Sequence, residues 1–156
     1  RDSVVRSLKG IFDSNSHTIT SNIVKDCVMA SCGNPTQTMV SLIPTYASVI
    51  AALHFVIGVD VGAHMVENLA ITLHKSLQRQ TATDALIADK LPHNCLLLLM
   101  FLYNLRILSH KLIFDIMDIF IGADQEDKLL SEVDAELLVQ ICLNHEVGMC
   151  CQEPIK

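Results

Sequence analysis

Apolar residues recur along this chain at spacings of three and four, which is the period of one face of an α-helix. The first run, Val4, Val5, Leu8, Ile11 and Phe12, predicts an amphipathic helix that ends near residues 13–16. No segment sustains the alternation of apolar and polar residues typical of a half-buried strand, and the sequence contains no Asn-Gly or Asp-Gly hairpin turn. The pattern therefore predicts an all-helical fold.

Capping residues, prolines and glycines divide the rest of the chain into six further helices. Their expected bounds are Thr18 or Thr20 to Gly33, Pro44 to Gly58, about Val61 to Arg79, Pro92 to a break near residues 108–110, Leu112 to Gly122, and Ser131 to Cys142. We expect Asp60 to cap the helix that begins near Val61, because its carboxylate can accept hydrogen bonds from free backbone N–H groups. Residues 80–90 are expected to interrupt the helical pattern.

The segment from Cys95 to Tyr103 is apolar on every face of its predicted helix, so neighbouring helices must cover it from several sides. Helices joined by short turns pack as antiparallel hairpins laid side by side, and no hairpin buries its apolar face without the next one. We therefore predict an α-solenoid of HEAT-like antiparallel helix hairpins. Residues 1–156 are expected to form one such domain of a larger protein, and a compact helical bundle is the structural alternative.

Composition narrows the choice of protein class. The chain is 51% apolar and only 18% charged, which fits a membrane protein, a domain with a large apolar contact surface, or part of a helical stack. The apolar run at 95–103 falls well short of the roughly 18 uncharged residues that a membrane-spanning helix needs. Asp2, Arg6 and Lys9 are unlike the start of a signal peptide. We expect neither a spanning helix nor a signal peptide.

Charge and cysteine spacing limit the partners. The net charge of −6 argues against sequence-independent binding of nucleic-acid backbones and favours a protein partner with basic patches. Cys27 and Cys32 are five residues apart, and Cys150 and Cys151 are adjacent, so neither pair has the spacing of a zinc ribbon or finger. We expect the six cysteines to be free thiols in a reducing compartment.

Motifs of catalysis do not occur in this sequence. His54, His64 and His74 are spaced ten residues apart, unlike the H-E-x-x-H arrangement of a zinc enzyme. There is no G-x-S-x-G nucleophile turn, and Gly58 and Gly62 are not followed by the Lys-Ser/Thr pair of a phosphate-binding loop. We predict a protein that is not an enzyme, with no catalytic residues, no metal site and no cofactor.

Three stretches, in this order, carry a resemblance to a known family: YASVIAALHFVIGVDVGAH at 46–64, LYNLRIL at 102–108 and LIFDIM at 112–117. They resemble the middle domain of eukaryotic initiation factor 4G, in the form found in nucleolar middle-domain-containing proteins of ribosome biogenesis. The IGVDVGAH run at 57–64 is the most specific part, and the resemblance covers roughly residues 1–145. Residues 146–154 depart from the family pattern, and the usual basic N-terminal region and C-terminal companion domain are not in this chain.

The resemblance implies a scaffold that binds and stimulates a DEAD-box RNA-dependent ATPase related to initiation factor 4A, by contacting both of its RecA-like lobes. For the nucleolar branch it also implies association with the pre-ribosomal particle and a part in 18S ribosomal RNA processing, in the nucleus and nucleolus. The alternative from the same fold is an RNA- or ribonucleoprotein-binding helical-repeat module in translation or mRNA processing.

Candidate partner-binding residues are polar side chains near the predicted turns or on polar helix faces. They are Asp60, His64, Asn104, Arg106, His110, Asp115 and Asp118. A solvated surface is the simpler interpretation of the carboxylates, including those at 124–127, and Asn104 could instead support its own turn. Where the carboxylates do meet a partner, we expect them to face lysine or arginine side chains and to steer association.

Overall fold

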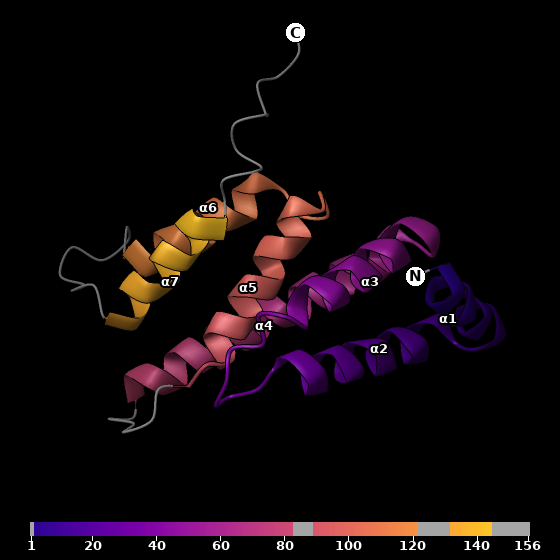
Figure 1. Cartoon of the computed structure of the whole chain (residues 1–156), viewed down its shortest axis with the longest axis horizontal. Coiled ribbons are helices and arrows are strands. Elements are labelled where there is room, and N and C mark those ends of the chain that lie inside the picture. The colour runs from indigo at the N-terminus through magenta and orange to yellow at the C-terminus, as the bar shows by residue number, and fades with distance from the viewer. Residues whose placement is uncertain (1, 83–88, 122–131, 145–156) are drawn as a thin grey trace, which may run out of the picture.

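The computed structural model describes residues 2–82, 89–121 and 132–144, and every regular element in these segments is an α-helix. The helices are α1 (Asp2–Ser14), α2 (His17–Cys32), α3 (Ile43–Val56), α4 (Val59–Ala82), α5 (Leu91–Asn104), α6 (His110–Ile121) and α7 (Glu132–Asn144) (Figure 1). The all-helical prediction is confirmed. The expected stop at Gly122 and the expected cap at Ser131 lie outside the described residues.

Prolines and glycines mark the helix ends largely as expected. Pro44 and Pro92 lie in the first turns of α3 and α5, and Gly33 caps the end of α2. Two predicted caps are wrong. α2 begins directly after Ser16, so Thr20 lies inside the helix and donates its hydroxyl to the Ser16 carbonyl at 3.1 Å. Asp60 lies within the first turn of α4, where its carboxylate meets the positive end of the helix dipole.

The helices pack in a regular order along the molecule. α1 packs on α3, α3 on α5, α5 on α7, and α2 on α4. The chain-adjacent pairs α1–α2, α3–α4, α4–α5 and α6–α7 are also in contact. Each described helix therefore meets its sequence neighbour or the helix two places along the chain. Figure 1 shows the result, an elongated arrangement with α1 at one end and α6 and α7 at the other.

α5 forms the centre of the core, as the apolar run at 95–103 predicted. All its residues from Pro92 to Tyr103 are buried except Phe101, which is partly buried. α3, α4 and α7 surround it, so a helix without a polar face has apolar neighbours on several sides. No helix of the described segments combines the length and the apolarity needed to cross a bilayer.

A buried asparagine on α5 fixes the connection between α2 and α3. Asn94 is 1% exposed. Its Oδ1 accepts a hydrogen bond from the Met39 backbone N–H at 2.8 Å, and its Nδ2 donates to the carbonyls of Asn34 and Gln37 at 2.8 and 2.9 Å. The side chain thus satisfies three backbone groups that have no helical partner, which offsets the cost of burying an amide.

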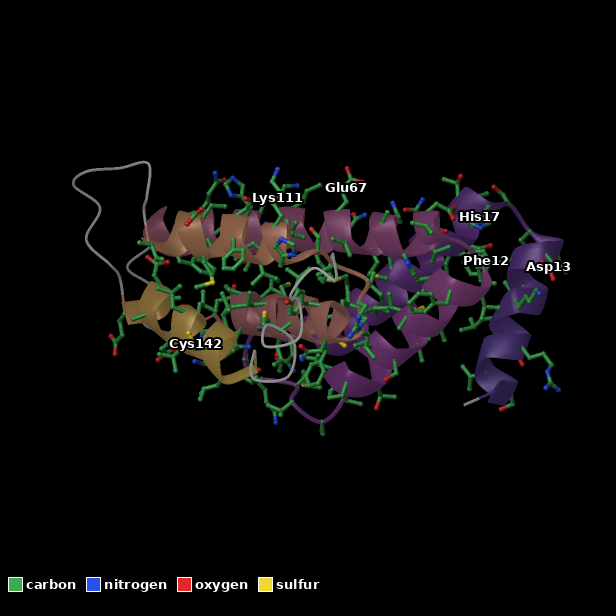
Figure 2. The ribbon with its side chains drawn as sticks, turned by 90° about the horizontal axis from the view of Figure 1, so that it is seen from above. Phe12, Asp13, His17, Glu67, Lys111 and Cys142 are labelled. Atoms are coloured by element: carbon green, nitrogen blue, oxygen red, sulfur yellow. The ribbon has the colours of Figure 1, made fainter. Side chains whose placement is uncertain are left out.

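A glycine allows α3 and α4 to pack closely near the turn that joins them. A Cβ atom on Gly62 would collide with the ring of His54 on α3, so only glycine allows α4 to approach α3 this closely. Next to this crossing, Phe12 of α1 joins Leu53 and Val61 in a small second cluster of buried residues. The Phe12 ring also lies 5.0 Å from the ring of His17, between centroids, where α1 turns into α2 (Figure 2).

Candidate functional site: a partner-binding surface

Two turns that are far apart in the sequence border one groove. The α3–α4 turn and the start of α4 contribute Val59 and Ala63, and the α5–α6 turn contributes Ile107 and Leu108, to a groove of about 350 Å³. We call the surface formed by residues 55–60 and 104–110 the turn face. Since the carboxyl ends of α3 and α5 both lie here, the turn face combines the loops that follow these two helices.

The turn face exposes apolar side chains as well as polar ones. Phe55 and Val59 are 67% and 68% exposed, and Val56 and Leu105 are also open to solvent. Isolated exposed apolar residues are common on protein surfaces, but several in the two segments that border one groove, with Val59 in its lining, are typical of a contact surface. Sequence reasoning missed Phe55 and Val59 as surface residues, and it placed Val56 within the third helix without predicting its exposure.

Arg106 has a backbone conformation that normally belongs to glycine. Its φ of 62° is the one positive φ of a non-glycine residue in the described segments. The N–H of Arg106 donates to the Tyr103 carbonyl at 2.8 Å, and the N–H of Ile107 donates to the Leu102 carbonyl at 3.0 Å. These two bonds form a Schellman motif, which ends α5 and whose left-handed position favours glycine.

The arginine therefore carries a conformational cost of about 1 to 2 kcal/mol relative to ordinary helical or extended backbone. Its side chain is exposed, so packing does not repay that cost. Strained positions of this kind gather at binding and catalytic sites. Arg106 also sits between Asn104, the exposed last residue of α5, and His110, the exposed first residue of α6.

Asp60 lies on the other side of the turn face. Its Oδ2 is 3.1 Å from Nδ1 of His17, and both side chains are largely exposed. An exposed pair of this kind contributes little to stability, typically about 0 to 1 kcal/mol. Asp60 is thus held near α2 and remains open to solvent at the start of α4.

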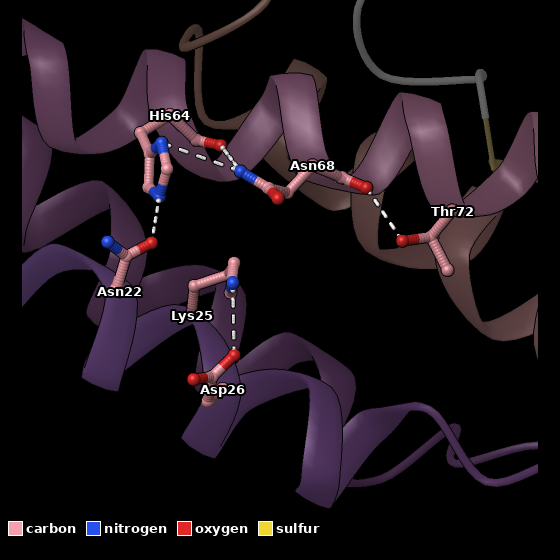
Figure 3. Close-up of polar contacts among 6 residues, drawn as sticks. All are labelled: Asn22, Lys25, Asp26, His64, Asn68 and Thr72. Carbon is pink, nitrogen blue, oxygen red and sulfur yellow. Dashed lines mark hydrogen bonds and ion pairs between the residues drawn. The ribbon is translucent and has the colours of Figure 1, made fainter.

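His64 lies in the seam between α2 and α4 and not on the turn face. Its Nε2 is 3.0 Å from Oδ1 of Asn22, an atom that can only accept, so Nε2 carries the proton (Figure 3). Asn68, one turn further along α4, donates from Nδ2 to the His64 carbonyl at 2.7 Å. The contact between His64 and Asn22 therefore joins α2 to α4.

The remaining candidates lie on α6. His110, Asp115 and Asp118 are all exposed. The His110 ring lies edge-on to Phe114 at 6.2 Å between centroids, and Asp115 borders a second, smaller hollow of about 130 Å³ between α4 and α6. The structure thus brings Asp60, Asn104, Arg106 and His110 to the turn face and leaves Asp115 and Asp118 further along α6.

The described segments hold no cluster of metal ligands, and their two buried cysteines are not activated. Within the described segments no three His, Cys, Asp or Glu side chains are grouped so that they could hold a metal ion. Burial raises the pKa of Cys32 to about 11 and that of Cys95 to about 12. Both thiols are therefore protonated and weakly nucleophilic at neutral pH.

One polar cluster was not found from the sequence. His93, at the start of α5, is buried, and its Nε2 lies 3.0 Å from Oε2 of Glu136 on α7. Burial, and secondly the charge of Lys90, lower the pKa of His93, while the hydrogen bond to Glu136 acts in the opposite direction. Gln140 donates from Nε2 to the His93 carbonyl at 3.0 Å. The sequence feature that could have indicated this cluster is the polar pair His93 and Asn94, which follows Pro92 in an otherwise apolar helix.

Comparison with known proteins gives one distant relative. The chain is 27% identical over 146 residues to suppressor of glycerol defect protein 1 of Schizosaccharomyces pombe. The match covers 91% of this chain and 17% of that protein. No family model matches the chain, and no solved structure matches it. The chain thus corresponds to a small part of a much longer relative.

Proposed function

We propose that this chain is a HEAT-like α-solenoid of the initiation factor 4G middle-domain type, which binds and stimulates a DEAD-box ATPase related to initiation factor 4A. Two features support the solenoid. The contacts α1–α3, α3–α5 and α5–α7 form one row of helices, as in stacked hairpins. The central helix α5 is buried among its neighbours, as expected for an inner member of a stack.

The observation that carries the functional proposal is the left-handed Arg106 on the turn face. An exposed arginine is maintained at a position that glycine would occupy without strain, next to the exposed Leu105, and the α3–α4 turn that borders the same groove exposes Phe55 and Val59. Arginine and aromatic side chains are the residues that most often dominate protein interfaces. We infer that Arg106 and Phe55 bind the ATPase, with Asp60, Asn104 and His110 around them.

Stimulation needs no chemistry from this chain. A DEAD-box ATPase alternates between open and closed arrangements of its two lobes, and a scaffold that binds the closed arrangement more tightly raises its population. A difference in affinity of about 1 to 3 kcal/mol would accelerate turnover roughly 5- to 150-fold. In the nucleolar branch the ATPase would act on the pre-ribosomal particle during 18S ribosomal RNA processing, which places the proposed function in the nucleus and nucleolus.

The test is a binding and turnover assay with purified domain and initiation-factor-4A-like ATPases. We expect binding and faster RNA-dependent ATP hydrolysis. Arg106→Gly should weaken binding while leaving the domain equally stable or up to about 1 kcal/mol more stable, because the strain at the Schellman position is relieved. That combination separates a binding role from a structural one.

Matched controls come from the opposite end of the molecule. Phe55→Ser should reduce binding, whereas Leu143→Ser on α7, at a site of similar exposure (70%), should not. Equal effects of the two variants, or no association with any such ATPase at micromolar concentration, would refute the proposal. Retention of single-stranded RNA on a filter by the isolated domain at moderate salt would instead favour the RNA-binding alternative.

A further inference from the structure

A second surface runs away from the turn face between α4 and α6. The groove of about 350 Å³ and the smaller hollow of about 130 Å³ share two lining residues, Ala70 of α4 and Leu112 of α6. The two hollows are therefore adjacent along α4, and together we call them the α4–α6 groove. From Ala63 to Leu77 it follows α4 for about 20 Å, the length of roughly four helical turns.

The floor of the groove suits the close approach of a helix. Ala63 and Ala70 lie two turns apart on the same face of α4, and small residues at that spacing let another helix come near. Ile119 of α6, which is 54% exposed, lines the far part of the groove. Recognition of a helix in a groove relies on such apolar contacts, repeated every three to four residues of the bound segment.

The charged side chains that line the groove are all acidic. Glu67 enters from α4, and Asp115 enters from α6 on the opposite wall. Neither carboxylate has an ion-pair or hydrogen-bond partner among the described residues. No lysine or arginine of the described segments lines either hollow. Lys111 projects from the same side of the molecule as Glu67 but stands outside the groove lining (Figure 2).

We infer that the α4–α6 groove binds an amphipathic helix of a partner protein, with an apolar stripe flanked by lysine or arginine. The stripe covers the alanine and isoleucine side chains, and the flanking cations pair with Glu67 and Asp115. This inference does not depend on the ATPase proposal, since the groove extends beyond the turn face and its occupant is defined by helix periodicity and positive charge.

The probe is a synthetic helix of about 18 residues, made of leucine at helical spacing and lysine elsewhere, and labelled for fluorescence anisotropy. Its controls are a peptide of the same composition in scrambled order and a peptide with glutamate in place of lysine. We expect saturable binding of the first peptide alone. Equal binding of the scrambled peptide, or no saturation below about 100 μM, would overturn the inference.

Variants of the domain locate the site. The double change Glu67→Lys with Asp115→Lys should weaken binding by about tenfold or more. Asp118→Lys, which makes the same charge change as Asp115→Lys alone, one turn further along α6 and outside the groove lining, should weaken binding by less than about threefold and by less than Asp115→Lys does. An equal loss for Asp118→Lys would show mere attraction to an acidic surface and would count against the groove.

A steric pair completes the test. Ala70→Trp should block the shared centre of the groove and weaken binding by about tenfold, whereas Ala70→Ser should leave binding unchanged. Circular dichroism melts of each variant show whether the domain remains folded. Since no ATPase is present in this assay, its failure would leave the proposal for the turn face standing, and the converse also holds.

Discussion

The centre and the N-terminal end of this molecule use similar apolar residues to different effect. On α5, Leu96, Leu99, Met100 and Leu102 are fully buried. On α1 and α2, four aliphatic side chains remain between 47% and 61% exposed: Val4, Ile11, Ile19 and Ile23. All four line an apolar groove of about 420 Å³. The difference lies in the number of neighbours, since α5 has three packed helices around it and the α1–α2 pair has helices on one side.

The comparison shows what an apolar pattern can and cannot specify. A stripe at spacings of three and four identifies the face of a helix that avoids water. Whether that face is covered depends on other helices, which the stripe does not contain. Substitutions at the centre and at the N-terminal end test this comparison. The expected changes in the free energy of unfolding differ between the two by several kcal/mol.

The largest loss of stability is expected for a substitution in the core around α5. Leu99→Ala removes a fully buried side chain of α5 and leaves a cavity, so the free energy of unfolding should fall by about 2 to 5 kcal/mol. Urea denaturation followed by circular dichroism measures this. Leu143→Ala on α7, at a site that is 70% exposed, is the control and should change stability by less than about 0.5 kcal/mol. Similar losses in both variants would contradict a core centred on α5.

The next effect concerns the buried amide of α5. Asn94→Ala leaves the Met39 N–H and the carbonyls of Asn34 and Gln37 without their partner, so stability should fall by about 1 to 3 kcal/mol. Hydrogen exchange should show early loss of protection at the Met39 amide. Asn22→Ala, which removes a single side-chain bond to His64, should cost less and leave Met39 protected.

These two positions also show how far the sequence could predict the fold. The apolar run at 95–103 predicted a central, covered helix, because a helix without a polar face has no other stable place. Pro44 and Pro92 marked helix starts, since proline suits the first turn. The role of Asn94 could not be predicted, because its three partners are 55 to 60 residues away in the sequence.

The candidate site was partly predicted for the same reason. Asn104, Arg106 and His110 were singled out from a local segment, and the structure places them together at the α5–α6 turn. His64 came from the same kind of local pattern, yet it lies in the α2–α4 seam because Asn22, distant in sequence, faces it. The left-handed backbone of Arg106 gave no signal, since arginine is not the residue that such a turn suggests.

A smaller effect is expected from pH at the α5–α7 contact. Burial lowers the pKa of His93 below its ordinary value of 6.5, so the folded state favours the neutral imidazole. This contribution to stability is fully present above pH 6.5 and is lost as the pH falls through the lower folded-state pKa. His93→Gln, which keeps a donor toward Glu136, should flatten the dependence in this window. An unchanged slope between pH 7 and 5 would exclude His93 as its source.

The smallest effect is expected at the N-terminal groove and completes the comparison. Ile23→Ser on α2 replaces a side chain that is already 57% exposed, so the free energy of unfolding should change by no more than about 0.5 kcal/mol. Leu99→Ala introduces no polar atom, and yet it should lower the free energy of unfolding several times more. If Ile23→Ser instead destabilised the domain by more than about 1 kcal/mol, the α1–α2 pair would be packed as tightly as the centre, and the number of helical neighbours would no longer explain the difference.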